Sequence, residues 1–221
     1  MKDHSLVDDV IERYCEAYTS AETPALAALN RETQIKTQIP IMLSGHLQGA
    51  FLQMVSCMIQ PKYVLEIGTF TGYSAICLAK GLQKNGMLFT IDVNEEMEDL
   101  CNKHFMAAGY QNTIKALIGD AANIIPAIDV EFDLVFIDAD KQNYARYYDM
   151  IFDKVKPGGF ILVDNVLYHG EVVLPEAEQS KNAKAMHAFN EKIKADERIT
   201  HFLLPLRDGI MMLQKKPSTD N

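Results

Sequence analysis

Two stretches of the chain, LVFID at residues 134–138 and FILVDN at residues 160–165, decide the fold. Each is an unbroken apolar run that ends in an acidic residue, which is typical of a strand covered on both faces in a parallel sheet. Because ligands bind outside the carboxyl ends of such strands, we expect Asp138, Asp164 and Asn165 to meet at one edge. With Lys141 three residues after Asp138, these oxygen ligands indicate a divalent-cation site beside a lysine.

The surrounding sequence alternates between short apolar runs and helical patterns. We expect strands at 64–68, 87–92, 114–118, 134–138 and 160–164, and helical segments at 73–82, 95–108, 121–125 and 144–155. Strands separated by helices predict right-handed crossovers and a doubly wound α/β sheet. A helix at 183–195 is followed by strands at 199–204 and 210–214. Because only the short segment 205–209 joins those two strands, we expect a hairpin with an antiparallel last strand.

The N-terminal part of the chain is predicted to be helical. Apolar residues recur at helical spacing in 6–18, 21–34 and 47–59, with a loop at 39–45, and Ser5 stands where the first helix needs an N-cap. No repeat or linker interrupts the sequence. We therefore expect a single domain over 1–221, in which 1–60 form a helical cap and lid and 61–221 form the core. The N-terminal helices carry an apolar stripe without an obvious partner, which predicts a homodimer.

Composition narrows the function classes. The 221 residues are 48% hydrophobic, and the formal net charge of −9 disfavours binding to nucleic acid, which needs clustered basic residues. No apolar run reaches the ~20 residues of a membrane span, and the N-terminus lacks a signal-peptide core. The four cysteines, at positions 15, 57, 77 and 101, have no C-x-x-C spacing. We expect free thiols and a cytoplasmic protein.

A glycine-containing turn follows the first strand. The segment EIGTFTGYS at 66–74 has the spacing G-x-x-x-G, and it matches neither the dinucleotide motif G-x-G-x-x-G nor a P-loop. Asp92 ends the second strand and Asp120 follows the third, at positions where carboxylates reach a ribose and an adenine amino group. Each feature has a purely structural alternative, a turn that needs glycine or a helix N-cap. Together they predict a slot for an adenosine without a pyrophosphate.

These motifs resemble those of the cation-dependent class I O-methyltransferases, the group of catechol and caffeoyl-CoA O-methyltransferases. The likeness runs from about residue 39 to residue 215. It rests on VLEIG at 64–68 with TGYS at 71–74, FIDADK at 136–141 with NY at 143–144, PGG at 157–159, VDNVL at 163–167 and LPLRDG at 204–209. The first motif is common to methyltransferases in general. The combination D-x-x-K and D-N is more specific.

The resemblance implies a Rossmann-like seven-stranded sheet and S-adenosylmethionine as methyl donor. The donor-binding positions of the family fall on Met42, Ser44, Glu66, Gly68, Phe70, Ser74, Asp92, Asp120, Ala121 and Asp138. Met42 and Ser44 correspond to the lid. The metal ligands of the family fall on Asp138, Asp164 and Asn165, and its catalytic residues on Lys141 and Asp138.

A cation bound to vicinal hydroxyls lowers their pKa and orients one of them toward the methyl group. Two carboxylates and an amide oxygen suit Mg²⁺ best, and Mn²⁺ or Ca²⁺ accept the same ligands. Lys141 accepts the proton only when it is neutral. We expect burial and the neighbouring cation to lower its pKa. The alternative is that Lys141 is an ion-pair partner or an electrostatic orienter.

On the acceptor side, the resemblance points to Tyr168 as an aromatic that packs on the acceptor ring and to Arg207 at the hairpin tip. The tyrosines and basic residues expected for a CoA ester are not evident around 184–189. We therefore favour a small aromatic acceptor with catechol-like vicinal hydroxyls over a CoA thioester. The competing hypotheses are a donor-binding protein without this chemistry and a methyltransferase with another acceptor, such as an acyl-CoA ester or nucleic acid.

Overall fold

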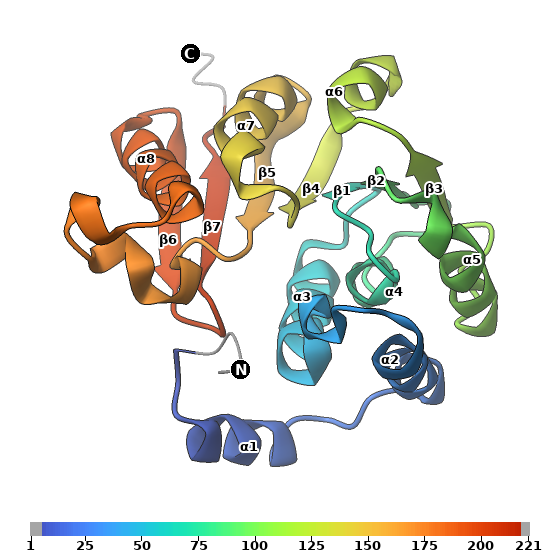
Figure 1. Cartoon of the computed structure of the whole chain (residues 1–221). Helices are drawn as coiled ribbons and strands as arrows, with labels where there is room; N and C mark the ends of the chain where they lie inside the picture. The colour runs from blue at the N-terminus through green and yellow to red at the C-terminus, as the bar shows by residue number, and fades with distance from the viewer. Residues whose placement is uncertain (1–5, 218–221) are drawn as a thin grey trace.

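The computed structural model describes residues 6–217 and contains one seven-stranded sheet flanked by helices (Figure 1). The strands are β1 Tyr63–Ile67, β2 Met87–Asp92, β3 Ile114–Ile118, β4 Phe132–Ile137, β5 Val155–Val163, β6 Ile199–Leu204 and β7 Ile210–Lys215. The helices are α1 Asp9–Ala17, α2 Pro24–Lys36, α3 Gly45–Ile59, α4 Tyr73–Ala79, α5 Glu98–Ala107, α6 Ala121–Ile124, α7 Tyr144–Phe152 and α8 Lys181–Ala195. Single-turn helices include η1 Pro40–Met42, η4 Lys141–Asn143 and η5 Tyr168–Val173.

The strand order is β3-β2-β1-β4-β5-β7-β6. Strands β1 to β5 pair in parallel, whereas β7 is antiparallel to both β5 and β6. The predicted doubly wound sheet with an antiparallel last strand is therefore confirmed. The chain order reverses direction between β1 and β4, which is where ligands bind in such sheets.

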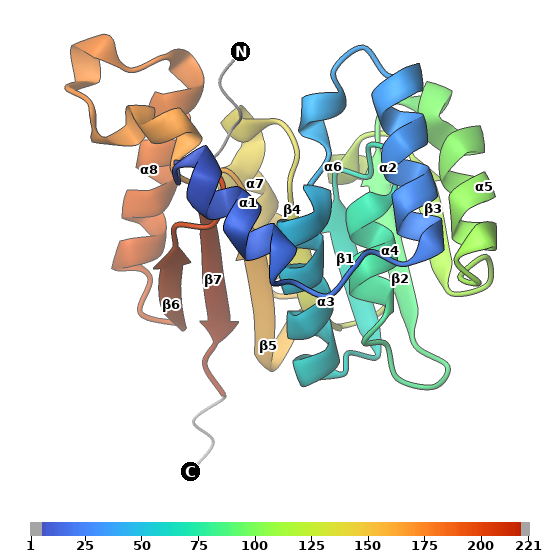
Figure 2. The same cartoon turned by 90° about the horizontal axis from the view of Figure 1, so that it is seen from below.

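Two apolar cores cover the two faces of the sheet. Successive side chains of β4 point to opposite faces of the sheet. Val135 and Ile137 pack with α6, α7 and α8 in one core, and Leu134 and Phe136 pack with α2 to α5 in the other. All four side chains are completely buried. This explains why β4 reads as an unbroken apolar run, because both of its faces are covered. Figure 1 shows the two helical layers above and below the sheet, and in Figure 2 the helices α1 to α4 lie in front of it.

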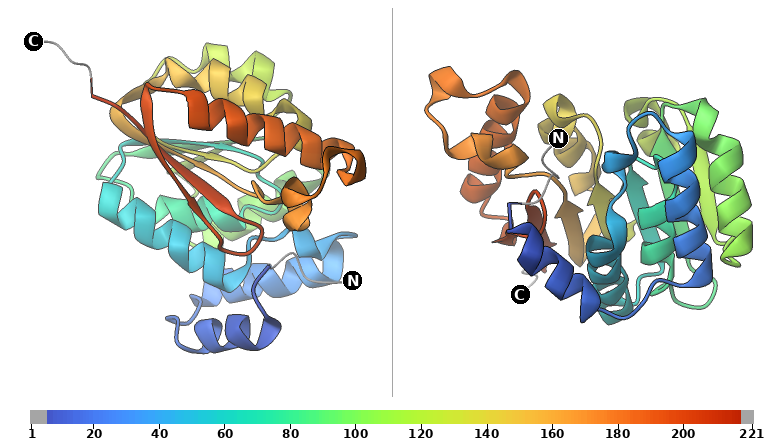
Figure 3. Two further views of the ribbon diagram at one scale, coloured as in Figure 1. Left: turned by 90° about the vertical axis from the view of Figure 1, so that its left-hand side faces the viewer. Right: turned by 60° about the horizontal axis from the view of Figure 1, so that its bottom comes forward.

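The N-terminal helices extend the lower layer. Helix α2 contributes buried side chains to the core, whereas α1 contributes none and is the outermost element in Figure 3. Asp8 caps α1, because its side chain accepts a hydrogen bond from the Val10 N–H at 2.8 Å. The predicted N-cap Ser5 lies outside the described residues. None of the helices in the described chain has the length and apolar character needed to cross a membrane.

Several predicted boundaries differ from the structure. Helix α7 ends at Phe152 rather than at residue 155, and β5 begins at Val155 rather than at residue 160. The PGG motif at 157–159 lies within β5, where the pairing with β4 shifts register. Gly158 has φ +81°, which lets the chain bulge without leaving the strand. The loop predicted at 39–45 contains η1, and α3 begins at Gly45.

Candidate active site

The parallel register brings the two acidic strand ends together. Ile137 of β4 is paired with Ile67 of β1 on one side and with Val163 of β5 on the other. The next residue of each strand continues this row, since the Asp138 N–H donates to the Ile67 carbonyl and the Asp164 N–H to the Ile137 carbonyl, both at 2.9 Å. The predicted meeting of Asp138 and Asp164 at one edge thus follows from the sheet register.

The row also explains why residue 68 is a glycine. A Cβ built on Gly68 stands 1.9 Å from the carbonyl oxygen of Asp138, and its φ is +104°. Any side chain at this position clashes with the backbone of β4. The glycine therefore lets the end of β1 approach Asp138 closely, so that the glycine turn and the acidic strand ends border one space.

That space is a cavity of about 580 Å³, large enough for a nucleoside-sized ligand and a small second molecule. Most of the predicted site residues line it. They are Met42, Ser44, Gly68, Phe70, Ser74, Asp92, Ala121, Asp138, Lys141, Asp164, Asn165, Tyr168 and Arg207. The other two predicted residues, Glu66 and Asp120, are not among its lining residues.

Asp92 and Asp120 shape the backbone on the donor side. Oδ2 of Asp92 accepts hydrogen bonds from the backbone N–H groups of Thr69 at 3.0 Å and Phe70 at 2.8 Å. Oδ1 of Asp120 accepts from the Ala122 N–H at 2.8 Å, and Asp120 is the N-cap of α6. Oδ1 of Asp120 therefore acts as a helix N-cap, which is the purely structural alternative named for this residue in the sequence analysis. Asp92 fixes the glycine turn and also lines the cavity.

Glu66 is fully buried behind the glycine turn. Burial raises the pKa of its carboxyl to about 8, although hydrogen bonds from Ser74 and Thr90 oppose the shift. The Thr90 hydroxyl donates to Oε2 at 2.5 Å, whereas Oε1 has no hydrogen-bond partner within the described chain. Glu66 therefore lies behind the cavity wall, where burial disfavours its ionised form.

Lys141 is held by two neighbours on the cation side. Its Nζ donates to Oδ1 of Asp138 at 2.9 Å and to the hydroxyl of Tyr144 at 2.8 Å. Burial lowers the pKa of Lys141, but the nearby charges of Asp138 and Asp164 outweigh burial and raise the pKa above its ordinary value. The lowered pKa expected from the sequence assumes a neighbouring cation, and for the protein by itself the two carboxylates stabilise the ammonium.

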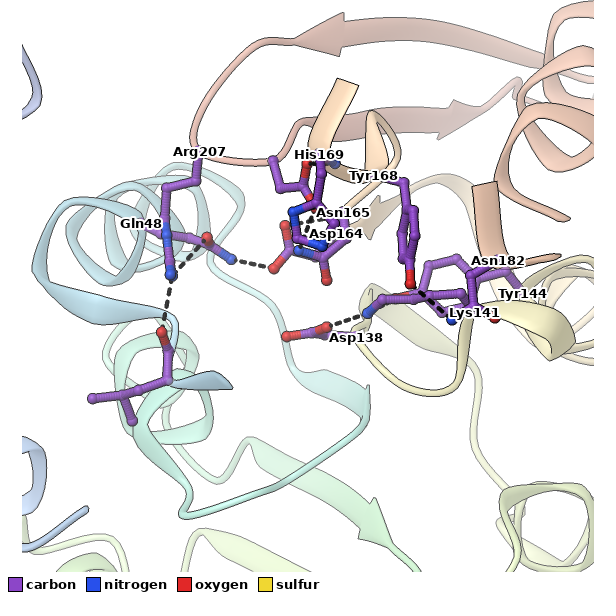
Figure 4. A network of polar contacts seen from close by, with 12 residues as sticks. Gln48, Asp138, Lys141, Tyr144, Asp164, Asn165, Tyr168, His169, Asn182 and Arg207 are labelled. Carbon is purple, nitrogen blue, oxygen red and sulfur yellow. Dashed lines mark hydrogen bonds and ion pairs between the residues drawn. The ribbon is translucent and has the colours of Figure 1, made fainter. Parts of the chain in front are cut away.

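Asp164 and Asn165 point into the same cavity although they are adjacent in sequence (Figure 4). Asn165 adopts a left-handed conformation with φ +59°, which breaks the alternation of an extended strand and which asparagine tolerates well. Asp164 is 3% exposed. Burial, and then the charge of Asp138, raise the pKa of Asp164 to about 7. Two carboxylates therefore face each other with incomplete charge compensation.

This donor set fits a hard divalent cation. Asp138 and Asp164 offer carboxylate oxygens and Asn165 an amide oxygen, the ligand types that Mg²⁺ and Ca²⁺ prefer. No group of three or more His, Cys, Asp or Glu side chains in residues 6–217 is arranged to hold a metal ion. The amide of Asn165 would consequently have to act as the third protein ligand.

Some cavity residues were not predicted from the sequence. Asn182, in the first turn of α8, donates from Nδ2 to the hydroxyl of Tyr168 at 2.8 Å and accepts from Gln142 at 3.1 Å. Both Asn182 and Gln142 line the cavity beside Tyr168. No local sequence signal marks Asn182, because its role depends on how α8 packs against residues 141–143. These amides form a polar wall next to the aromatic ring.

Arg207 reaches the edge of the cavity from the β6–β7 hairpin. Its Nη1 donates to the carbonyl oxygens of Leu43 at 2.9 Å and Ser44, which belong to the predicted lid. Met42, the other predicted lid residue, is 53% exposed. Part of the Arg207 guanidinium is therefore engaged with the backbone of residues 43–44, while the side chain still lines the cavity.

Solved structures with the same fold are methyltransferases. The SAH-bound methyltransferase PaMTH1 from Podospora anserina is 28% identical, has a TM-score of 0.86 and covers 94% of this chain and 94% of its own. The O-methyltransferase TomG from Streptomyces achromogenes, solved in complex with SAM and involved in tomaymycin synthesis, is 25% identical with a TM-score of 0.86, covering 94% of this chain and 96% of its own.

Sequence comparison identifies the protein family. The family model described as O-methyltransferase matches residues 16–216. Caffeoyl-CoA O-methyltransferase 1 from Arabidopsis thaliana is 32% identical over 219 residues, which covers 94% of this chain and 85% of that protein. The chain belongs to the O-methyltransferase family. The resemblance drawn from the sequence motifs is confirmed at this level.

Proposed function

We propose that this protein transfers the methyl group of S-adenosylmethionine to one hydroxyl of a small catechol-like acceptor, with a divalent cation held by Asp138, Asp164 and Asn165. The observation that carries the proposal is the shared cavity, in which these three side chains and Lys141 lie beside the glycine turn. A protein that only binds the donor has no need of two mutually repelling carboxylates, one of them buried, next to a lysine. That arrangement favours an enzyme over a binding module.

The donor half of the cavity suits an adenosine and a methionine group. Gly68 allows close approach of the backbone, and Ser74 offers a hydroxyl at the start of α4. Asp92 stands at the end of β2, where it reaches ribose hydroxyls while it holds the turn, and Ala121 borders the adenine. Met42 and Ser44 belong to the loop that covers the donor. Asp120 supports the donor site indirectly, as the N-cap of α6. Glu66 supports it from its buried position behind the cavity wall.

Methyl transfer is a displacement in line with the sulfonium, so the acceptor hydroxyl must lose its proton and point at the methyl carbon. A divalent cation held at this site would lower the pKa of the acceptor hydroxyls bound to it. Lys141 Nζ takes the proton when it is neutral, the phenolate oxygen forms the new C–O bond, and the C–S bond breaks to give S-adenosylhomocysteine. Lys141 loses its own proton more readily when the charges of Asp138 and Asp164 are compensated.

The residues around Tyr168 favour a small acceptor. Lys141 and Arg207 are the only lysine and arginine among the described residues that line the cavity, and both are partly engaged, with Asp138 and with the carbonyls of residues 43–44. A CoA ester carries phosphates that need several cationic partners. The ring of Tyr168 offers an aromatic face, and Arg207 is a second acceptor contact at the edge. The CoA ester remains the second candidate, because the Arabidopsis relative is a caffeoyl-CoA O-methyltransferase.

An acceptor panel tests this proposal. Purified protein with S-adenosylmethionine and Mg²⁺ is offered a catechol, the matching monohydroxy phenol and caffeoyl-CoA, and products are identified by mass spectrometry. We expect methylation of the catechol and none of the monohydroxy compound. Preferential methylation of caffeoyl-CoA would move the acceptor to the CoA ester, and methylation of the monohydroxy phenol at an equal rate would refute the requirement for vicinal hydroxyls.

We also propose that a second copy of the chain covers α1. Its residues Val10, Ile11, Tyr14 and Tyr18 are between 53% and 77% exposed, and α1 buries no residue against its own chain. An apolar stripe of this kind is typical of a protein–protein contact. We expect a dimeric mass in solution at micromolar concentration. A monomeric mass at that concentration would contradict the proposal.

A further inference from the structure

We propose that Gln48 is a positioning residue that fixes the carboxylate of Asp164, and that Arg207 holds Gln48 and the loop at residues 43–44 in the same network (Figure 4). The inference rests on the proposed function, because it assigns residues that support the cation side of the site. Neither residue was predicted from the sequence to act in this way. Gln48 does not line the cavity, so it acts on the cation site indirectly, through its hydrogen bond to Asp164.

Gln48 lies in the first turn of α3 and is 1% exposed. Its Nε2 donates to Oδ2 of Asp164 at 2.7 Å, while the backbone N–H of Asn165 donates to Oδ1 at 2.8 Å. One donor on each oxygen fixes the plane of the carboxylate. Burial of an unpaired amide is costly, and the buried amide of Gln48 is paired at both ends, with Asp164 and with Arg207.

The orientation of the Gln48 amide is set by its second partner. Arg207 Nη1 approaches Oε1 of Gln48 at 3.4 Å, on the opposite side from Asp164. A guanidinium has donors alone, and an ionised carboxylate has acceptors alone. Turning the amide over would place oxygen against carboxylate and NH₂ against guanidinium, two repulsive contacts. Arg207 therefore keeps the donor end of Gln48 directed at Asp164.

The same hairpin tip is fastened to both sides of the cavity. Arg207 Nη1 bonds the carbonyls of Leu43 and Ser44, as described above. On the other side, the carbonyl oxygens of Asp208 and Gly209 accept from the N–H groups of Leu167 at 2.9 Å and Val166 at 3.1 Å, just after the proposed cation ligands. The tip thus ties the loop beside the donor to the segment that carries Asp164 and Asn165. Arg207 should consequently influence both donor and cation binding, and Gln48 the cation alone.

The test uses Gln48→Met, which keeps a side chain of similar length and removes both hydrogen bonds. The matched control is Gln53→Met, the same replacement at a half-buried position of α3 away from the cavity. Mn²⁺ binding is titrated by electron paramagnetic resonance, and S-adenosylhomocysteine binding is measured calorimetrically in EDTA. Loss of a residue that orients a metal ligand typically costs 10–100-fold in metal affinity. We expect Gln48→Met to bind Mn²⁺ about tenfold more weakly, with S-adenosylhomocysteine affinity unchanged, and Gln53→Met to behave as the wild type.

Unchanged Mn²⁺ affinity in folded Gln48→Met would overturn the inference and leave the proposed function standing. Absence of Mn²⁺ binding in the wild type would overturn both. If Gln48→Met fails to fold, Gln48→Asn serves instead, because its amide is one methylene too short to reach Asp164 and the same loss is expected.

Arg207→Met completes a double-mutant cycle. If Arg207 acts on the cation through Gln48, the variant carrying both changes loses no more Mn²⁺ affinity than Gln48→Met alone. We also expect Arg207→Met, unlike Gln48→Met, to weaken S-adenosylhomocysteine binding, because it releases the loop at residues 43–44. Losses of Mn²⁺ affinity that multiply in the double variant would show that the two residues act independently, and would contradict the network.

Discussion

The donor half and the cation half of the cavity both place acidic residues at strand ends, but the two pairs of carboxylates are satisfied differently. On the donor side, Asp92 accepts hydrogen bonds from backbone N–H groups of the glycine turn after β1, and Asp120 accepts one from its own loop. On the cation side, Asp138 and Asp164 lie on adjacent strands, and each raises the energy of the other's charge, as the raised pKa of Asp164 indicates. Their side-chain partners are Lys141 and Gln48, and Asp164 also accepts from the backbone N–H of Asn165.

The donor-side carboxylates therefore shape the cavity by holding its backbone. The cation-side carboxylates keep negative charge that a bound cation can neutralise. Asp92 holds the glycine turn whether or not a ligand is present. Asp164 gains most from an added positive charge, because burial and repulsion from Asp138 disfavour its ionised form. Replacements on the two sides should therefore have different signatures. Changes on the cation side should abolish turnover without loss of donor affinity, and changes on the donor side should weaken donor binding.

The largest effect is expected for Asp164→Ala. The change removes one of two carboxylates from the proposed cation site, and we expect turnover to fall by roughly 100-fold or more. Affinity for S-adenosylhomocysteine, measured by calorimetry in EDTA, should stay within about twofold of the wild type. An active Asp164→Ala enzyme would refute the cation assignment, and a parallel loss of S-adenosylhomocysteine affinity would show that Asp164 belongs to the donor half.

The next effect concerns Lys141. Lys141→Met should lower kcat by about 10²-fold, at the low end of the usual contribution of a general base. Lys141→Arg is the control, because arginine keeps the positive charge and cannot accept a proton. We expect both variants to be slow in steady-state assays with a catechol. If Lys141→Arg retains most of the wild-type rate, Lys141 is an electrostatic orienter, the alternative that its raised pKa in the protein by itself also favours.

A smaller and different effect is expected for Asp92. Asp92→Asn keeps one side-chain oxygen for the N–H groups of Thr69 and Phe70, so the fold should be little affected, while ribose binding loses a charged acceptor. We expect about tenfold weaker S-adenosylmethionine binding and an unchanged affinity for Mn²⁺. Asp92→Ala should in addition lose about 1–2 kcal/mol of unfolding free energy, because the N–H groups of Thr69, Phe70 and Asn94 lose their partner. Equal donor affinity in Asp92→Asn and the wild type would remove Asp92 from the donor site.

The last effect concerns the dependence of stability on pH rather than activity or binding. The folded protein keeps the proton of Glu66 up to about pH 8, whereas an unfolded chain releases it near the ordinary value of 4.5. Unfolding therefore releases a proton between these two pH values, and this contribution to stability falls as pH rises, by at most about 1.4 kcal/mol per pH unit. Glu66→Gln lacks this contribution. Urea unfolding in EDTA between pH 5.5 and 8 should give a steeper decline for the wild type, and equal slopes would contradict the raised pKa.

Much of this arrangement is predictable from local sequence. The unbroken apolar runs before Asp138 and Asp164 indicate strands covered on both faces, and parallel strands that end in the same direction bring those residues together. The short link between the last two runs indicates an antiparallel strand. These inferences succeed because they depend on patterns within a few residues and on rules of chain connection that hold for any sheet.

Other features depend on contacts between distant segments. Gln48 and Asp164 are 116 positions apart, and only the packing of α3 against the end of β5 makes them partners. The positive φ of Asn165, which turns its side chain into the cavity, is set by the hairpin that binds the following residues. The raised pKa of Lys141 in the protein by itself also depends on distant segments, because the charges of Asp138 and Asp164 that cause it come from two strands.

The central claim is that methyl transfer depends on a cation held at the ends of β4 and β5. The most direct measurement follows transfer from S-adenosylmethionine to a catechol after the protein is stripped with EDTA, and then again after Mg²⁺ is restored. The account predicts that stripped enzyme loses nearly all activity while it still binds S-adenosylhomocysteine, and that Mg²⁺ restores the initial rate. Full activity in the presence of EDTA would contradict it.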